Sequence, residues 1–243
     1  MSIDIYSQAQ TVICISEKVR DALRVGMKDN VRAVVVYNGT DPQKFFPADA
    51  ACTDSKPQQS CEILVVGNLL RGKGHELVLN AIARLRSAFP HLRCQIVGEG
   101  PDRARFAELA STLGIAHQVQ FLGRLTRNEV ANAMRNCAVF VLPSTYEGLG
   151  CVYLEAMACG KPIIGCEGQG IDEVVEHGKN GWLIPVNNLE HLVQGLSTLL
   201  SSTELRSQMG MAARQTVLDR FTLLHQAQGL VGVYEAAIQR GLR

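Results

Sequence analysis

From residue 62 onward, short apolar runs alternate with stretches in which apolar residues recur every three or four positions. Such short runs are typical of buried parallel strands. They lie at residues 63–66, 94–97, 119–122, 138–142, 162–164 and 182–184. The intervening stretches have helical spacing, as in the series Val78, Ile82, Leu85 and Phe89. Regular alternation of strands and helices predicts an α/β fold with a doubly wound parallel sheet.

A doubly wound, Rossmann-like sheet binds its ligands beyond the carboxyl ends of the strands. The loops that follow residues 66, 97, 122 and 142 therefore belong to one crevice in this prediction. These loops are rich in glycine, which allows a backbone to approach a ligand closely. The crevice is where we look for candidate chemistry.

The first sixty residues have a different pattern. Strands are predicted at 11–15 and 31–36 with a helix between them, and Asn38-Gly39 predicts a turn. Three elements are too few for an independent core, so we interpret residues 1–46 as the end of another domain. The polar, proline-containing residues 47–60 are typical of a linker, and residues 61–243 form the main domain.

The C-terminal stretch, residues 188–240, is predicted to be helical. An apolar stripe runs along its last part at helical spacing. Its members are Leu224, Ala227, Val231, Tyr234 and Ile238.

Composition narrows the class of protein. The chain has a net charge of +1 and 47% hydrophobic residues, which gives no reason to expect a nucleic-acid partner. No apolar run reaches the ~18–20 residues of a membrane span, and the N-terminus lacks a signal-peptide pattern. The eight cysteines form no CxxC pair and lie mostly in apolar runs, so we expect reduced structural thiols in a cytosolic protein.

Two loops have sequences suited to phosphate. The first, at residues 67–74, follows a strand and opens a helix, where unpaired N–H groups favour anions, and Lys73 adds a charge. It approaches a P-loop, but Gly74 replaces the Ser or Thr that would hold Mg²⁺, which disfavours an NTPase. The second, Gly98-Glu99-Gly100-Pro101, lacks the third glycine of a dinucleotide fingerprint. A plain glycine turn remains the alternative for both.

Two glutamates bracket the loop after residue 142. Glu147 precedes Gly148 and Gly150, and Glu155 lies in the helix that follows. A carboxylate can accept two hydrogen bonds from vicinal hydroxyls such as those of a ribose. The alternative is that both are charges stabilised by a helix N-terminus, which suits Glu147 better than Glu155 with its apolar neighbours. The chain contains no DxD pair, which disfavours Mg²⁺-dependent sugar-nucleotide chemistry.

The combined motif is Pro143-Ser144-x-x-Glu147-Gly148-x-Gly150, continued by Glu155-Ala-Met-Ala-x-Gly160-x-Pro162. Its two glutamates are separated by seven residues. At these positions the sequence resembles the glycosyl transferases group 1 family, which comprises retaining, nucleotide-sugar-dependent enzymes of the GT-B architecture. The resemblance covers roughly residues 11–240, and the main domain would be the C-terminal, donor-binding half.

The resemblance implies roles for individual residues. Lys73 would contact the donor diphosphate, Glu147 would hold and position the sugar, and Glu155 would hold the ribose hydroxyls. We expect Glu147 and Lys73 to be catalytic. The remaining expected donor contacts are Asn68, Gly98, Arg124, Leu125, Gly148, Leu149 and Gly150. The family needs no metal or other cofactor, so none is expected here.

Two departures from the family pattern affect the expectation. Asn68 stands where the family often has Arg, and Arg71 is a possible substitute. The acceptor-binding N-terminal half, which usually carries a catalytic His, is represented only by its last strand–helix–strand. We therefore expect a donor-binding part that transfers little or nothing alone.

The resemblance implies that the full enzyme transfers a sugar from a nucleotide diphosphate sugar to a glycan or lipid-linked acceptor. Bacterial surface-polysaccharide synthesis is the expected setting. The expected location is the cytoplasm, with peripheral contact at the inner face of the membrane left open. The alternative is a non-catalytic nucleotide-sugar-binding module or a truncated inactive fragment.

Overall fold

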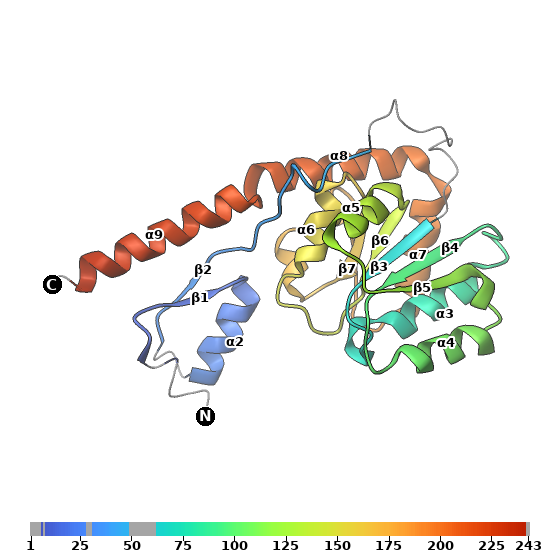
Figure 1. The fold of residues 1–243 in the computed structure, drawn as a ribbon, viewed down its shortest axis with the longest axis horizontal. Helices are drawn as coiled ribbons and strands as arrows, with labels where there is room; N and C mark the ends of the chain where they lie inside the picture. Colours follow the sequence, from blue (N-terminus) through green and yellow to red (C-terminus); the bar gives the residue numbers. More distant parts are fainter. Residues whose placement is uncertain (1–5, 7, 28–30, 49–61, 242–243) are drawn as a thin grey trace.

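The computed structural model describes residues 6, 8–27, 31–48 and 62–241 (Figure 1). Its centre is a six-stranded sheet in the order β5-β4-β3-β6-β7-β8, with every pair parallel. Successive strands run outward from β3 in one direction and then from β6 in the other, which is the doubly wound topology that the pattern predicted. The strands are β3 (Glu62–Val66), β4 (Arg93–Val97), β5 (Val119–Gly123), β6 (Val139–Val141), β7 (Ile163–Cys166) and β8 (Trp182–Ile184).

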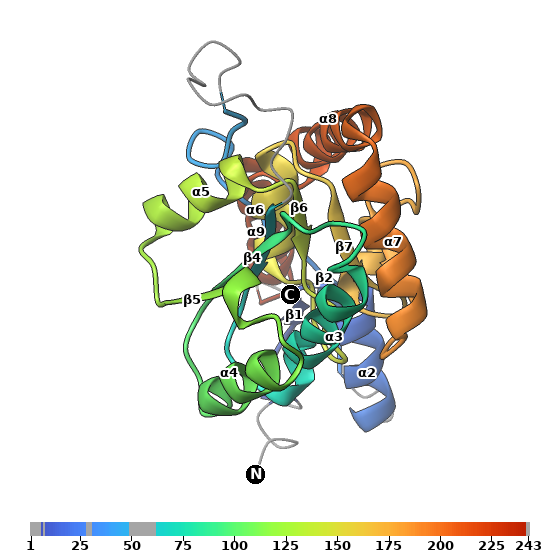
Figure 2. The same cartoon turned by 90° about the vertical axis from the view of Figure 1, so that its right-hand side faces the viewer.

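Helices cover both faces of this sheet. Helices α3, α4 and α7 pack together on one face, and α5 and α6 pack together on the other (Figures 1 and 2). Their bounds are α3 (His75–Leu85), α4 (Arg103–Thr112), α5 (Arg127–Asn136), α6 (Cys151–Ala158) and α7 (Leu189–Ser201). Short 3₁₀ turns occur at η1 (Arg71–Lys73), η2 (Ala116–Gln118) and η3 (Gly170–Glu173). The central strand β3 is buried on both faces, which explains its continuous apolar run.

The N-terminal part forms a separate two-stranded parallel sheet of β1 (Val12–Cys14) and β2 (Ala33–Val35), joined by α2 (Glu17–Met27). The turn predicted at Asn38-Gly39 is wrong. Residues 36–39 form neither a turn nor a bend, and the next residue, Thr40, bridges Thr222. A Cβ at Gly39 would overlap the Thr222 carbonyl, so this glycine permits a close approach of two backbones.

Two helices, α8 (Thr203–Arg220) and α9 (Leu223–Gly241), complete the chain. Helix α9 projects away from the central sheet and passes beside β2, where a Cβ at Gly229 would crowd Val36 (Figure 1). Four members of the predicted apolar stripe, Leu224, Val231, Tyr234 and Ile238, are more than half exposed. Within the described part of the chain, none of the helices is long and apolar enough to cross a membrane.

The segment before the predicted linker lies against the main domain. Phe45 is fully buried in the main core, and Arg135 of α5 donates to the Lys44 carbonyl at 3.3 Å. Most of the predicted linker lies outside the described residues, as do Cys52 and Cys61. The six cysteines of the described part are free thiols, and all but Cys151 are buried.

The side chain of Tyr153 is predicted to stabilise the core next to the loop that follows β6. Its buried hydroxyl donates to the Leu142 carbonyl, and its ring packs edge-on against Phe140 with centroids 5.6 Å apart. Tyr153→Phe should lower the free energy of unfolding, measured in urea, by about 0.5–1.5 kcal/mol, because one buried hydrogen bond is lost. Tyr146→Phe, at a side chain that is 68% exposed, should cause no change. Equal losses in the two variants would contradict this role of Tyr153.

Candidate functional site

The loops at the carboxyl ends of the strands are joined by backbone hydrogen bonds. The Gly67 amide, after β3, donates to the Val97 carbonyl of β4 at 3.0 Å. The Gly98 amide, after β4, donates to the Gly123 carbonyl at the end of β5 at 2.8 Å. These bonds bring the predicted loops together at one edge of the sheet, where the sequence predicts the crevice.

Two glycines allow the loops to approach this closely. Gly98 has φ 139°, and a Cβ there would overlap the Gly67 carbonyl oxygen. Gly74 has φ 79°, and a Cβ there would overlap the Pro143 carbonyl in the loop after β6. Both conformations are costly for residues that carry a side chain. The glycines recognised in the sequence therefore place backbone against backbone around the crevice.

Lys73 and Glu147 come together in this crevice. The Lys73 Nζ atom, at the end of η1, lies 2.7 Å from Oε2 of Glu147. Both side chains are largely shielded, with 26% and 17% of their surfaces exposed. The Glu147 amide is fixed in turn by the Gln169 side chain, whose Oε1 accepts at 3.0 Å. The two expected catalytic residues are thus in direct contact although 74 positions separate them.

Helix α6 begins next to this ion pair. Gly150 precedes it with φ 75°, and no side chain of the described residues caps its N-terminus. The Tyr153 amide donates to the Gly150 carbonyl at 3.0 Å, which leaves the amides of Cys151 and Val152 to face a ligand. The helix dipole places partial positive charge at the same end. Leu149 is fully buried and attaches the loop to the hydrophobic core, while Gly148 is partly exposed. This end of α6 suits an anion.

Glu155 lies one turn into α6 and has a partner that sequence reasoning missed. Its Oε1 atom is 2.6 Å from the guanidinium of Arg127, the first residue of α5. The Glu155 side chain is 10% exposed and that of Arg127 is 67% exposed. Burial raises the pKa of Glu155, and the charges of Arg127 and Lys44 offset that rise only in part. The carboxylate is held at the crevice at an energetic cost.

His75 is a second residue that the sequence analysis missed. It is fully buried at the start of α3, and its Nε2 lies 3.0 Å from the Asn68 carbonyl, which can only accept. Burial lowers the pKa of His75, so the neutral ring donates to Asn68 and holds the backbone of the β3 loop. The ring also packs on Phe106 of α4, with centroids 5.2 Å apart.

The other expected residues lie around the same edge of the sheet. The Asn68 side chain is exposed, and the Arg71 guanidinium, 75% exposed, lies 3.8 Å from the Asp102 carboxylate. Arg124 is exposed and Leu125 is half-buried immediately after β5. Because the β5 end is bonded to the loop at Gly98, these two residues form one end of the crevice.

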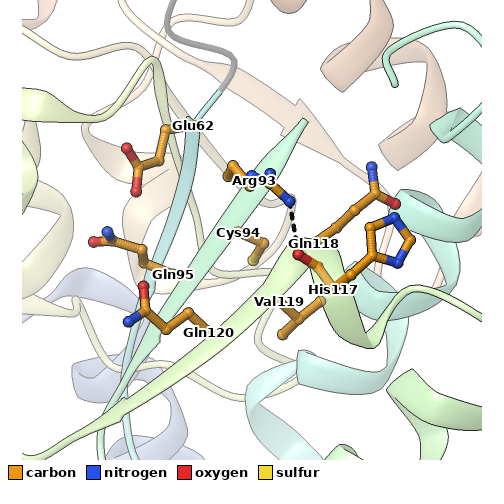
Figure 3. A pocket seen from close by; sticks show the side chains of 8 residues that line it. All are labelled: Glu62, Arg93, Cys94, Gln95, His117, Gln118, Val119 and Gln120. Atoms are coloured by element: carbon orange, nitrogen blue, oxygen red, sulfur yellow. Dashed lines mark hydrogen bonds between the residues drawn. The ribbon is translucent and has the colours of Figure 1, made fainter. Parts of the chain in front are cut away.

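A separate cavity of about 420 Å³ lies at the opposite, amino ends of β3, β4 and β5 (Figure 3). Glu62 and Gln95 line it, and Arg93 donates to the His117 carbonyl at 2.7 Å beside it. Open α/β sheets bind their ligands at the carboxyl ends of the strands. We therefore take the loops at the carboxyl ends of the strands as the candidate site.

Comparisons with known proteins identify the family of this chain. Residues 54–216 match the family described as glycosyl transferases group 1. The chain belongs to this family. A D-inositol 3-phosphate glycosyltransferase of Stackebrandtia nassauensis is 32% identical over 224 residues, which are 87% of this chain and 50% of the relative.

Solved structures of other proteins share the fold. Sucrose-phosphate synthase of Thermosynechococcus elongatus superposes with a TM-score of 0.88 at 26% identity, covering 98% of this chain and 60% of that one. An Anabaena protein solved with UDP and glucose has a TM-score of 0.85 at 22% identity, covering 96% and 65%. The chain spans about half the length of the curated relatives it matches.

Because a buried, ionised Glu155 costs free energy, we predict that this side chain affects the thermal stability of the protein in a pH-dependent way. A carboxyl group whose pKa is raised by folding contributes stability at low pH, and this contribution is lost as the pH rises through the folded-state pKa. Glu155→Gln should therefore raise the melting temperature at neutral pH, because it removes the buried charge. The difference from wild type should shrink as the pH is lowered and Glu155 takes up its proton.

Scanning calorimetry across acidic and neutral pH checks this expectation. Glu235→Gln is the matched control, because Glu235 is exposed on the projecting helix α9. A lower melting temperature for Glu155→Gln at neutral pH would show instead that the Arg127 ion pair outweighs the cost of burial.

Proposed function

We propose that this crevice binds the diphosphate of a nucleotide sugar, and that the chain is the donor-binding part of a glycosyltransferase. The observation that carries the proposal is the convergence of Lys73 with the uncapped N-terminus of α6. Both favour anionic oxygens, and Glu147 and Glu155 flank them as acceptors for hydroxyl groups. The Anabaena neighbour, which was solved with UDP and glucose, supports a ligand of this class.

Each group then has a distinct role. Lys73 and the backbone amides of Leu149 and Gly150 bind the phosphates. As the bond to the sugar breaks, charge accumulates on the leaving diphosphate, and these fixed positive groups stabilise it. When Lys73 turns to the phosphate, the Glu147 carboxylate is released from its ion pair and accepts a hydrogen bond from the sugar.

The nucleoside end uses the rest of the crevice. Glu155 accepts hydrogen bonds from the ribose hydroxyls, for which Arg127 must yield its place at the carboxylate. Asn68, Gly98, Arg124 and Leu125 contact the phosphate and the base, and Gly148 leaves room for the sugar. The proposed site takes up its donor without a metal or other cofactor.

The wider role rests on the family. We propose that the full-length enzyme transfers the sugar with retention to a glycan or lipid-linked acceptor in bacterial surface-polysaccharide synthesis. It would act in the cytoplasm, with peripheral contact at the inner face of the membrane. An acceptor-binding N-terminal half is the partner that this role requires, and the chain's coverage of about half of its relatives favours it.

The same coverage supports one alternative, a non-catalytic nucleotide-sugar-binding module or a truncated inactive fragment. Both functions require the donor crevice, but only the enzyme requires a second half. A measurement of turnover distinguishes the two functions.

The first measurement is a calorimetric titration with UDP, GDP and ADP, each with and without Mg²⁺. One diphosphate should bind independently of metal. Glu155→Ala should weaken it about tenfold or more, equivalent to ~1.4 kcal/mol, because the ribose loses its acceptor. Lys73→Gln should weaken the same diphosphate because it removes a charge from the phosphates.

Glu235→Ala is the control and should bind as wild type does. If no diphosphate binds to the folded chain, or if binding requires Mg²⁺, the proposed mode of donor binding is wrong.

A second measurement addresses transfer. The chain alone should release little or no diphosphate from a nucleotide sugar in the presence of an acceptor. Addition of the separately expressed N-terminal half of a full-length relative should produce turnover that Glu147→Gln abolishes. Binding without turnover in the mixture would favour the non-catalytic module, and robust transfer by the chain alone would contradict its proposed dependence on a second half.

A further inference from the structure

A carboxylate outside the crevice connects the N-terminal part of the chain to the main domain. Glu173 ends η3, the short turn that follows β7. Its Oε2 accepts from the Glu17 amide at 2.8 Å and from the Tyr37 hydroxyl at 2.9 Å. Its Oε1 accepts from the Lys18 amide at 2.8 Å. One side chain thus receives three donors from a part of the sequence more than 130 positions away.

These bonds cap α2 from η3, a distant part of the sequence. The first amides of a helix have no acceptors within the helix, and a carboxylate at that end is also favoured by the dipole. Glu173 takes the first two amides of α2, and the Ser16 hydroxyl accepts from the third, that of Val19, at 3.2 Å. Burial, reinforced by Glu173, raises the pKa of Tyr37 to about 12, so its hydroxyl remains a donor. Glu173 therefore ties the start of α2 to η3, while the rest of α2 packs on β1 and β2.

The capped end of α2 lies directly on residues 147–150, which we call the donor loop. A Cβ at Gly148 would be 3.0 Å from Cδ1 of Ile15 and 3.4 Å from Cγ2 of Val19. These apolar side chains therefore bear on Gly148, between the two residues that the proposed function assigns to sugar and phosphate.

The other side of the same loop is held by the turn that carries Glu173. The Gly170 amide donates to the Glu147 carbonyl at 3.0 Å, and Gln169 accepts from the Glu147 amide at 3.0 Å. A Cβ at Gly170 would overlap the Gly148 carbonyl. Residues 147–150 are thus enclosed between η3 and the start of α2.

We propose that Glu173 is a positioning residue for the donor loop, and that it acts through α2. By fixing α2 in place, it presses Ile15 and Val19 onto Gly148 and keeps the loop at 147–150 in the geometry that binds the donor phosphates. The expected effect of Glu173 on donor binding rests on the proposed function. Its expected effect on the geometry of the loop is independent of that function.

Glu173→Gln tests the proposal, because it keeps the size of the side chain and replaces one acceptor oxygen by a donor facing other donors. Hydrogen exchange of the wild-type and variant chains is measured without ligand. Exchange in peptides covering residues 147–150 should accelerate, whereas peptides from β3 should be unchanged. Affinity for UDP, GDP or ADP, whichever binds the wild type, should fall about tenfold.

Glu176→Gln is the matched control. It makes the same chemical change three positions away, at a side chain that is 66% exposed and pairs with Lys179 instead of α2. It should alter neither exchange in the loop nor affinity. If Glu173→Gln fails to fold, Tyr37→Phe removes one of the three bonds and should accelerate the same peptides to a smaller extent.

A double-mutant cycle with Ile15→Ala distinguishes action through α2 from a general loss of structure. If Glu173 acts through the apolar contact, the affinity of the double variant should match that of the weaker-binding single variant. Additive losses, or unchanged loop exchange in Glu173→Gln, would overturn the proposal. If the wild type binds no diphosphate, the proposed function fails, and loop exchange alone still decides the role of Glu173.

Discussion

The crevice depends on a single constraint on hydrogen bonding. Because parallel strands end at the same edge of the sheet, the backbone N–H and C=O groups of their loops must form hydrogen bonds with one another. The loops after β3, β4 and β5 do so by direct amide–carbonyl bonds. Glycine at positions 74 and 98 removes the side chains that would hold the loops apart. The shape of the site is consequently a property of the backbone, and the charged side chains occupy a framework that is already complete.

The electrostatics of the crevice follow from that framework. Its two carboxylates are shielded from water and each has a cation, Lys73 for Glu147 and Arg127 for Glu155. The proposed donor brings phosphate for Lys73 and hydroxyls for both carboxylates, so binding exchanges existing interactions for new ones. Net affinity is therefore smaller than the sum of the new contacts.

The sequence was sufficient for the fold, because strand runs, helical spacing and glycine loops are local signals. It placed Lys73 and Glu147 at one crevice, and the structure brings them within 2.7 Å. Asn38-Gly39 misled because a glycine needed for close packing has the same local sequence as a glycine in a turn. Arg127 and Glu173 were missed because their partners lie 28 and more than 130 positions away. His75 was missed because its burial depends on packing against Phe106 of α4.

The contact between Gly148 and Gly170 restricts how this crevice can change. A methyl group at residue 170 has no space, and one at residue 148 meets the side chains of Ile15 and Val19. Libraries built to alter the accepted donor gain nothing from varying either glycine. The variable positions are the exposed side chains at the rim, Asn68, Arg71 and Arg124, which can be exchanged without moving the backbone. Diversification of this scaffold is thus confined to its edges, while the backbone contacts between its loops leave no room for added side chains.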